Sequence, residues 1–536
     1  MSRHGLAIPV RRANRQVEWD SCGDLAAALS GRVSEPVFAL PLQLRHGKFP
    51  GKFPRPSLAL CAAFALAAMS GGCIVTADLP DPALDIPANY KADANSTQDL
   101  PPTMDWWRAF RSRELTVLME EAQTVNLDIA AAVARIRQAD ALAQTAGAAL
   151  LPSVNGNLSA SRSRSSSTTG TVTSATPITG RGEVTNYNAS LSASYEIDFW
   201  GKNRDALLAA EETANANRFD RDVVILTTLA STANAYFQVV AAQERINIAT
   251  RNIASAQRIY DAIKARVDAG TGSDLDLAQQ ESLLANQKAS VPPLRQALAQ
   301  NANILATLVA RPPERVNLTG GSLGAIAIPR VTPGMPSELL TQRPDIRRQE
   351  NALASATASV GSARAQFFPS IQLTGQGGYQ SAALALLFTP QSAFFSMAAG
   401  LTQPIFDAGR IQANFDLQQA RQDELLQTYR KTVVSAFADV DTALSTLKQT
   451  SERLRLQRIV VSASRRAFEL SERQLRAGTA DIVTVLNTQL TLFQAEDSLA
   501  QFQLARLLAV VSLYQALGGG WSPGGETRTE RSANAL

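Results

Sequence analysis

Apolar and polar residues alternate most clearly along the segment 187–199. Every second residue from Tyr187 to Phe199 is apolar, and the residues between them are Asn, Ser, Glu or Asp. A period of two places the apolar side chains on one face of a β-strand and the polar ones on the other. A run of 13 alternating residues with aromatics at its ends is typical of a transmembrane β-strand. An amphipathic strand of a soluble sheet is the alternative.

Three further segments alternate in the same way. The pattern predicts strands at about 153–162, 186–199, 370–381 and 394–406. Four strands are too few to close a barrel, and an open edge cannot face lipid because its backbone N–H and C=O groups would be unpaired. Several chains must therefore share one wall. Two chains would give a barrel that its own side chains fill, whereas three would leave a channel, so we expect a closed trimer with twelve strands.

The period becomes helical after each pair of strands. The segment from Gly201 to Gly270 contains no proline and no internal glycine, and a second such segment runs from Gly409 to Gly478 with the same spacing. Each would form a helix roughly 100 Å long. The sequence therefore predicts an internal duplication of a long helical hairpin, at 201–310 and at 409–517. Pro292 and Pro293 predict a kink in the first return helix.

The second return helix carries a seam of residues at seven-residue spacing, in which only Asp497 is not apolar. Its members are Leu486, Leu490, Phe493, Asp497, Ala500, Leu504, Leu507, Val511 and Tyr514. This spacing indicates packing of the coiled-coil type. A long intramolecular coiled coil without a lumen is the alternative, but strands joined directly to the helix ends favour a barrel that continues into the helical layer.

These patterns define the fold class and the domains. The fold is an α+β membrane protein, in which a trimeric twelve-stranded β-barrel is continued by a long α-helical barrel. The expected domains are an N-terminal extension and signal peptide at 1–72, a first repeat at 73–310, a second repeat at 311–521 and a disordered tail at 522–536.

The N-terminal part carries an export signal. Basic residues precede an apolar run at 58–69, and Ser70-Gly71-Gly72 lead to Cys73. Twelve apolar residues are too few to span a bilayer but suit a signal peptide. The segment resembles a bacterial lipoprotein signal with Cys73 as the acylated residue, although Ser70 replaces the usual leucine. A plain signal-peptidase site nearby is the alternative, and residues 1–47 would precede the signal as an extension.

Composition excludes several classes of function. Residues 1–56 hold nine Lys or Arg against four acidic residues, so the rest of the chain is nearly neutral despite the net charge of +4, and nucleic acid has little support as a partner. No His or Cys follows Cys73. This excludes zinc sites of Cys/His type and nucleophiles activated by histidine. A carboxylate-based enzyme remains open because acidic residues are plentiful, but no pair of them is marked out. We therefore expect no enzyme activity, no metal and no cofactor.

Together these features resemble the TolC-like outer-membrane efflux proteins, in their NodT-type lipoprotein branch. The residues that carry the resemblance are Asp105-Trp106-Trp107, Tyr195 to Lys202, Arg266 to Gly270, Val291 to Leu294, Gln342 to Arg347, Gln403 to Arg410 and Leu517 to Trp521. The resemblance implies a trimer in the outer membrane of a Gram-negative cell, with its helices in the periplasm. It also implies a passive conduit, on which a membrane-fusion adaptor docks and for which an inner-membrane pump of the resistance-nodulation-division type supplies the energy.

The family resemblance also implies where the adaptor docks. Its contacts are expected at the two hairpin tips, namely Arg266, Gly270, Thr271, Gly272, Arg476, Gly478 and Thr479. Glycine at these points also permits the left-handed backbone that ends a helix, so a capping role alone is the alternative.

Family members narrow the channel just after the second tip, often with an acidic residue and an arginine three positions later. Asn487 and Leu490 occupy those positions here, so this pair is missing. Asp274, Asp276 and Asp481 are candidates for an acidic ring, and Val483 or Leu486 for an apolar constriction. Asp274 and Asp481 are alternatively first-turn acids that satisfy helix N-termini.

Two classes of function remain open at this point. The first is a transport duct, for efflux of small molecules or for type I secretion of a protein. The second is a structural coiled-coil lipoprotein of the envelope without a channel.

Overall fold

The computed structural model describes residues 78–84, 86–87, 90–91, 103–164, 183–316, 318, 320–329, 331 and 334–521. All of them belong to the unit Gly71–Leu536. Cys73, the expected signal peptide and the expected disordered tail at 522–536 lie outside the described residues.

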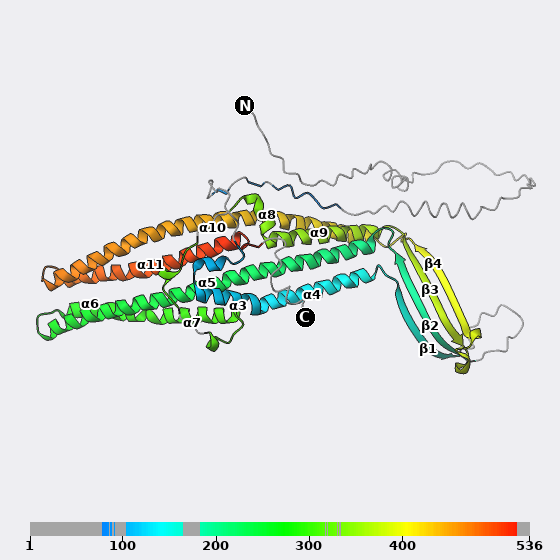
Figure 1. Ribbon diagram of the computed structural model, residues 1–536, viewed down its shortest axis with the longest axis horizontal. Coiled ribbons are helices and arrows are strands. Elements are labelled where there is room, and N and C mark those ends of the chain that lie inside the picture. The colour runs from blue at the N-terminus through cyan, green and yellow to red at the C-terminus, as the bar shows by residue number, and fades with distance from the viewer. Residues whose placement is uncertain are drawn as a thin grey trace, which may run out of the picture. The chain divides into compact units, whose positions relative to one another are not determined.

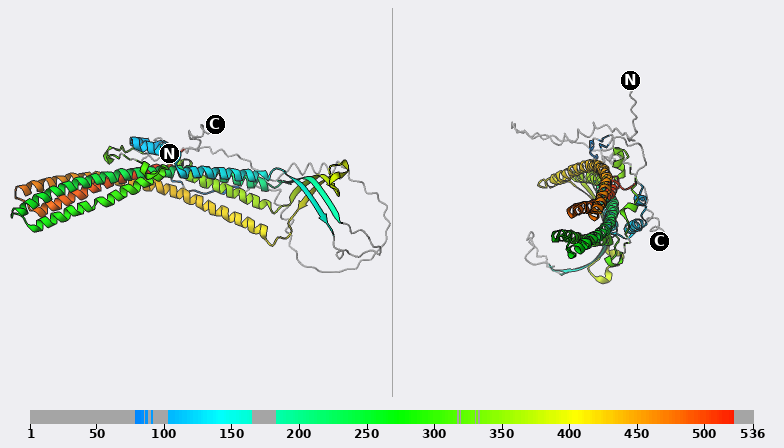
Figure 2. Two further views of the ribbon diagram at one scale, coloured as in Figure 1. Left: turned by 90° about the horizontal axis from the view of Figure 1, so that it is seen from below. Right: turned by 90° about the vertical axis from the view of Figure 1, so that its left-hand side faces the viewer.

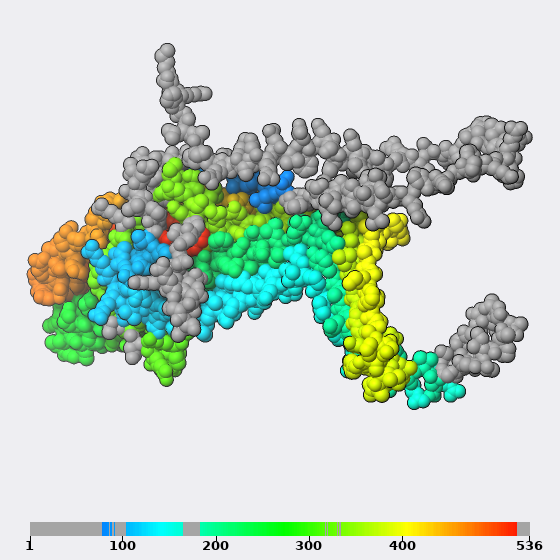
Figure 3. Space-filling model, turned by 45° about the vertical axis from the view of Figure 1, so that its right-hand side comes forward, coloured from blue at the N-terminus to red at the C-terminus, as the bar shows by residue number. Residues whose placement is uncertain are grey.

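The four strands form one antiparallel sheet in chain order. Their bounds are β1 Ser153–Ser163, β2 Val184–Ile197, β3 Ser370–Ser381 and β4 Ala393–Thr402. β1 and β4 each pair with one neighbour only, so both outer edges of the sheet are open. Figure 3 shows the β3–β4 side of the sheet in yellow, and no helix covers the face seen there.

Two strands end earlier than the alternation predicted. β4 was expected to reach about residue 406 but ends at Thr402, because Pro404 has no N–H to donate to a ladder. β2 was expected to reach 199 but ends at Ile197, because the carboxylate of Asp198 turns to accept bonds from the backbone N–H groups of Asn203 (3.0 Å) and Arg204 (2.8 Å).

Four helices run side by side next to the sheet, in the order α4, α5, α9 and α10 (Figure 1). Their bounds are α4 Leu127–Ala148, α5 Lys202–Asp268, α9 Pro344–Ala365 and α10 Arg410–Arg476. α5 and α10 each contain 67 residues, as the duplication predicts. By length and composition, α5 contains a stretch apolar enough to cross a membrane, but 56% of that stretch is buried inside the protein.

Beyond this layer the chain reverses direction after each long helix, and the return helices pack along the long ones (Figure 2). α5 is followed by α6 Asp274–Ala289 and α7 Val291–Leu308, and α10 by α11 Ile482–Ala516. The first return helix is divided in two where a kink was predicted, with Pro292 and Pro293 in the first turn of α7. Proline is accepted there because first-turn N–H groups have no intrahelical partner.

Shorter elements surround the middle of the helices. They are η1 Trp106–Phe110, α3 Arg113–Val125, η2 Pro313–Arg315, η3 Leu323–Ala325, η4 Pro336–Glu338 and α8 Leu339–Gln342, and η5 Leu384–Leu386 and η6 Pro390–Ser392 connect β3 with β4. The largest apolar core lies at this level. The rings of Trp106 and Tyr514 stack there with their centroids 4.9 Å apart, and the ring centroids of Phe110 and Phe237 are 5.1 Å apart.

Candidate functional site: a two-faced sheet and two helix tips

The register of the sheet separates apolar from polar side chains. Directly paired residues share a face. One row joins Val154, Ala193, Gly375 and Met397, and the next joins Asn155, Ser192, Gln376 and Ser396. The same alternation continues along the strands, and we call these sides the apolar face and the polar face.

Within the described part of the chain, several large side chains of the apolar face are left exposed. Phe395 is 83% exposed, Met397 87% and Leu158 79%. Such a band of large apolar side chains, on a sheet whose other face is hydrophilic, needs an apolar medium such as lipid. The open edges of β1 and β4 need a further strand for the same reason.

The junction between sheet and helices is built twice in the same manner. Gly201 and Gly409 precede α5 and α10 with φ of 83° and 81°, a left-handed conformation that glycine adopts without strain. Asp407 accepts bonds from the backbone N–H groups of Gly409 (3.0 Å) and Ile411 (2.8 Å). These bonds, that of Ile411 above all, lower the pKa of the Asp407 carboxyl. Asp198 holds the first junction in the equivalent way.

One buried carboxyl distinguishes the first junction from the second. Asp205 is 5% exposed, and its Oδ2 has no hydrogen-bond partner among the described residues. Burial, together with the charge of Asp198, raises the pKa of Asp205 to about 6. The alternation of the sequence gave no sign of this group, because an acid in a first helical turn usually faces solvent.

The two hairpin tips have the same backbone. At the first tip, Gly270 donates to the carbonyl of Val267 (2.8 Å) and Thr271 to that of Arg266 (2.9 Å). At the second, Gly478 donates to Leu475 (3.1 Å) and Thr479 to Gln474 (2.9 Å). This is the Schellman arrangement, in which the glycine takes a positive φ, here 74° and 72°.

All of the expected tip residues are exposed, so they are open to a partner. Arg266, Gly270, Thr271, Gly272, Arg476, Gly478 and Thr479 are all in the exposed class. Arg476 forms an ion pair with Glu472 one turn before it, at 2.5 Å. A side chain at position 272 would lie 2.8 Å from the backbone nitrogen of Val267, so Gly272 also serves the turn itself.

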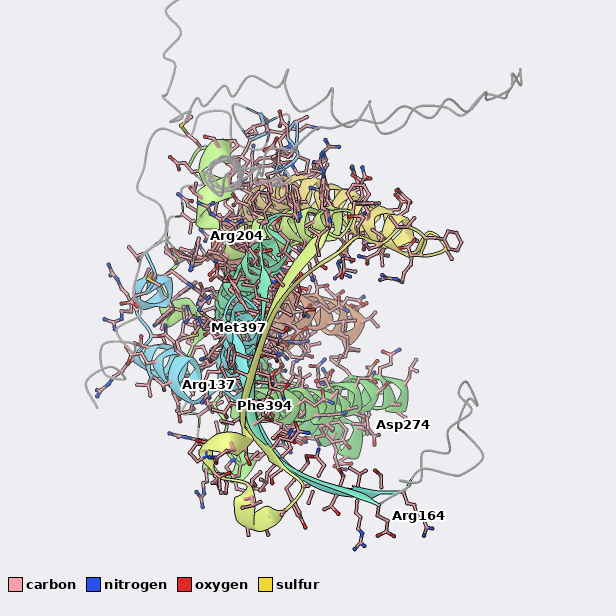
Figure 4. The ribbon with its side chains drawn as sticks, turned by 90° about the vertical axis from the view of Figure 1, so that its right-hand side faces the viewer. Arg137, Arg164, Arg204, Asp274, Phe394 and Met397 are labelled. Carbon is pink, nitrogen blue, oxygen red and sulfur yellow. The ribbon has the colours of Figure 1, made fainter. Side chains whose placement is uncertain are left out.

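The expected gate residues lie in the first turns after the tips. Figure 4 labels Asp274 at the start of α6. Asp274 is exposed and Asp276 half-exposed, and Ser273 rather than an aspartate caps the helix by accepting from the backbone N–H of Leu275 at 3.2 Å. Asp481 caps α11 by accepting from the backbone N–H of Thr484 at 2.9 Å. The Thr484 hydroxyl and this N–H lower the pKa of the Asp481 carboxyl.

The other gate candidates divide between surface and core. Val483, Asn487 and Leu490 are exposed, with 44% of Val483 and 39% of Leu490 accessible to solvent. Leu486 is half-buried and packs on an apolar cluster formed by α5, α10 and α11, which includes Ile259. Leu486 therefore contributes to packing within the chain.

Just beyond this level, two buried glutamines interrupt the apolar contacts between the hairpins. Gln280 and Gln489 each lie four residues before the packed pair Leu284 and Phe493. The Nε2 of Gln280 donates to the carbonyl of Ala256 at 2.8 Å, but the Oε1 of Gln280 and both amide atoms of Gln489 have no partner among the described residues. Unpaired buried polar atoms weaken this part of the seam.

Two sets of long-range polar contacts were not identified by sequence reasoning: one joins the two hairpins, and the other lies within the second half of the chain. Asp497, the one polar member of the seam on α11, accepts from Arg245 of α5 through both of its oxygens, at 2.6 and 3.0 Å. Arg343 donates to Asp345, to Asp439 of α10 and to the carbonyl of Ala516 at the end of α11. The only sequence feature that pointed to any of these contacts was Asp497, the one polar residue in the apolar seam of α11.

No group of three or more His, Cys, Asp or Glu in the described part of the chain is placed to hold a metal ion. Among the described residues there are open surface cavities of about 600 Å³, such as the one that Asp220, Arg348 and Arg421 help to line. The site is therefore the set of exposed faces and tips.

Comparison with known proteins defines the class of this protein. The sequence profile of the outer membrane efflux protein family matches residues 118–311 and 335–519, one match for each half of the duplication. The chain belongs to this family, whose members are transport proteins of the Gram-negative outer membrane, and it is an outer-membrane channel subunit of an efflux system.

Individual relatives cover most of the chain. It is 40% identical to the pyoverdine export outer membrane protein OpmQ of Pseudomonas putida over 442 residues, which are 82% of this chain and 93% of that protein. It is 30% identical to the probable efflux pump outer membrane protein TtgC of the same species over 458 residues, 84% and 93% of the two chains.

Solved structures agree with the sequence relatives. The outer-membrane channel OprN superimposes with a TM-score of 0.77 at 29% identity, over 84% of this chain and all of that one. The open state of the MtrE outer membrane channel of Neisseria gonorrhoeae gives 0.76 at 29% identity, over 85% and 100%. The expected fold is thereby confirmed: four strands per chain of a trimeric β-barrel, continued by an α-helical barrel.

Proposed function

We propose that this protein is the passive exit duct of a tripartite efflux system, with its helices in the periplasm and a pump of the inner membrane as the source of energy. The supporting observation is the two-faced sheet with two open edges, which can be completed only by further copies that enclose the polar face. Membership of the outer membrane efflux family fits this assignment.

The tips are the proposed docking site of a periplasmic membrane-fusion adaptor. In the first tip every residue of 266–272 except the half-buried Val267 is exposed, and in the second tip all of 476–479 are exposed. The two tips share one backbone geometry, so one adaptor segment can recognise both tips of a chain. The proposed pump partner is of the resistance-nodulation-division type.

The proposed gate consists of residues that follow these tips. Asp274, Asp276 and Asp481 present carboxylates near the start of the return helices, and Val483, Asn487 and Leu490 present further exposed side chains. Repeated by threefold symmetry, acidic groups at one level favour cations over anions.

Small molecules are the proposed cargo. Two relatives at 39–40% identity are named for export of pyoverdine, so a siderophore of that kind is the first cargo to test. Deletion of the gene, followed by measurement of siderophore in medium and periplasm, tests this choice. Unchanged export would rule it out.

Cys73 is the proposed lipid attachment site. Its context of small residues after an apolar run supports this. Labelled palmitate should enter the wild-type protein and be absent from Cys73→Ser. Equal labelling of both would refute lipidation at this residue.

Recordings of the ionic current through planar bilayers test whether the protein forms a channel. The purified trimer should insert with discrete conductance steps, because its strands surround a water-filled lumen. A structural coiled-coil lipoprotein would give no steps, and that outcome would end the proposal.

A further inference from the structure

The polar face of the sheet is almost without charge. Along the four strands it presents hydroxyl and amide side chains, as in the row Asn155, Ser192, Gln376 and Ser396. Among the described strand residues of this face, only Glu196 is charged, and its carboxylate pairs with Lys202 at 2.8 Å. A lumen with this lining offers hydrogen bonds to a solute and little selection by charge.

One side chain of this face is aromatic. The row Asn157, Ser190, Gly378 and Phe394 places Phe394 among small and polar neighbours. Phe394 is half-buried, whereas Phe395, the next residue on the opposite face, is 83% exposed. The ring of Phe394 therefore belongs to the polar face and is not part of the lipid-facing band.

The neighbour of Phe394 across the strand pair has no side chain and cannot acquire one. A Cβ at position 378 would lie 2.2 Å from the carbonyl oxygen of Ala189. No other ring stacks on Phe394 among the described residues. The directly paired position thus places no side chain over the ring, and the exposed part of this half-buried ring is available to a flat group of a solute.

Phe394 also has a defined place along the barrel. It is the second residue of β4 and follows η6. Figure 4 labels Phe394 on the sheet, and Figure 1 shows that β3 and β4 are joined at the end of the sheet away from the helices. In the trimer, three such rings stand around one mouth of the barrel. Every solute that crosses the barrel must pass them.

We propose that Phe394 forms an aromatic subsite for cargo in which a planar ring is carried on an uncharged, hydrogen-bonding frame. The ring of the cargo stacks on Phe394, while the hydroxyl and amide groups of the neighbouring rows bind its polar frame. Ring stacking adds selectivity because it depends on an aromatic face and not on apolar area alone. This inference rests on the proposed function as a duct.

The test uses the purified full-length trimer in planar bilayers and two neutral capped tripeptides, one with a central tryptophan and one with a central leucine. In the wild type, the tryptophan peptide should block the current at a lower concentration than the leucine peptide. Phe394→Leu keeps an apolar side chain but removes the ring, and should reduce this preference by about two- to tenfold. Phe394→Tyr should retain it.

Phe395→Leu is the matched control, since it removes a ring from the same strand on the opposite face. It should leave the preference unchanged. The inference would be overturned if Phe394→Leu kept the preference, or if both leucine variants lost it equally. A wild-type protein without any conductance would instead overturn the proposed duct, and with it the basis for a subsite.

Discussion

Two aspartates, Asp407 and Asp481, accept hydrogen bonds from backbone N–H groups at the starts of helices. Asp407 ties the turn between β4 and α10, and Asp481 begins α11 at the tip. The pKa of each carboxyl is lowered, that of Asp407 chiefly by the Ile411 N–H and that of Asp481 chiefly by the Thr484 hydroxyl. Both are therefore charged at neutral pH, and for Asp481 the capping role and the proposed gate role coexist.

Substitutions at Asp481 separate these roles. Asparagine also caps helices, so Asp481→Asn should keep the first turn of α11 while it removes the charge, and Asp481→Ala should lose both. Hydrogen exchange at the Thr484 amide measures the cap, and the reversal potential in a salt gradient measures the charge. If Asp481 lines the gate, Asp481→Asn lowers cation preference without faster exchange.

The pH dependence of the cap follows from the lowered pKa. A carboxyl whose pKa is lower in the folded state stabilises that state above its ordinary pKa, and this contribution is lost as the pH falls through the lowered value. The Thr484 amide should therefore keep its protection near neutral pH and lose it only in acid. A loss of protection close to neutral pH would contradict this assignment.

At the scale of elements, the long helices and their turns could be predicted from the sequence because their signals are local. Glycine at 201, 270, 409 and 478 marks each boundary, and these positions take positive φ. The ends of β2 and β4 were less predictable, since they depend on where Asp198 binds and on the missing N–H of Pro404. Contacts between hairpins could not be predicted, because their partners are far apart in sequence.

The pair Arg245–Asp497 provides a test of those contacts. Its two short bonds join α5 to α11, and both side chains are about two-thirds buried. Asp497→Ala should destabilise each chain by about 1–2 kcal/mol, because a half-buried guanidinium loses its charged partner. The apparent melting temperature of the trimer in detergent measures the effect.

An exposed pair on α10 serves as the control. Arg455 and Glu452 lie one turn apart, with side chains 61% and 52% exposed. Glu452→Ala should change stability by less than about 1 kcal/mol. Combining Arg245→Leu with Asp497→Leu should recover most of the lost stability, since an apolar pair restores the seam. Equal losses of stability in Asp497→Ala and Glu452→Ala would show that the pair Arg245–Asp497 stabilises the chain no more than an exposed ion pair does.

At the scale of the whole molecule, the sequence predicted the class of fold because the period of two and the count of strands constrain it together. An apolar face of this size must meet lipid, and four strands must find more strands. The contacts between residues of different protomers have no such local signal, because they depend on the tilt and offset of neighbouring chains.

Adjacent positions on β4 test the assignment of the two faces. Met397 lies on the apolar face and Ser396 on the polar face. Met397→Arg should cost about 2–4 kcal/mol per chain at the level of the bilayer core, and it should greatly reduce the yield of membrane-inserted trimer. Ser396→Arg places the same charge in the lumen and should leave insertion intact. The opposite result, or equal defects, would reverse the faces.

The open margins of the sheet also determine how such a protein can be made. A newly exported chain carries two bare strand edges and a water-repellent surface until it meets two more copies. By mass action, the amount of trimer at equilibrium depends on the cube of the free-chain concentration, so dilution should favour the incomplete barrel steeply. Until the ring closes, these exposed edges and apolar side chains favour aggregation, so we expect the unassembled chain to need periplasmic chaperones.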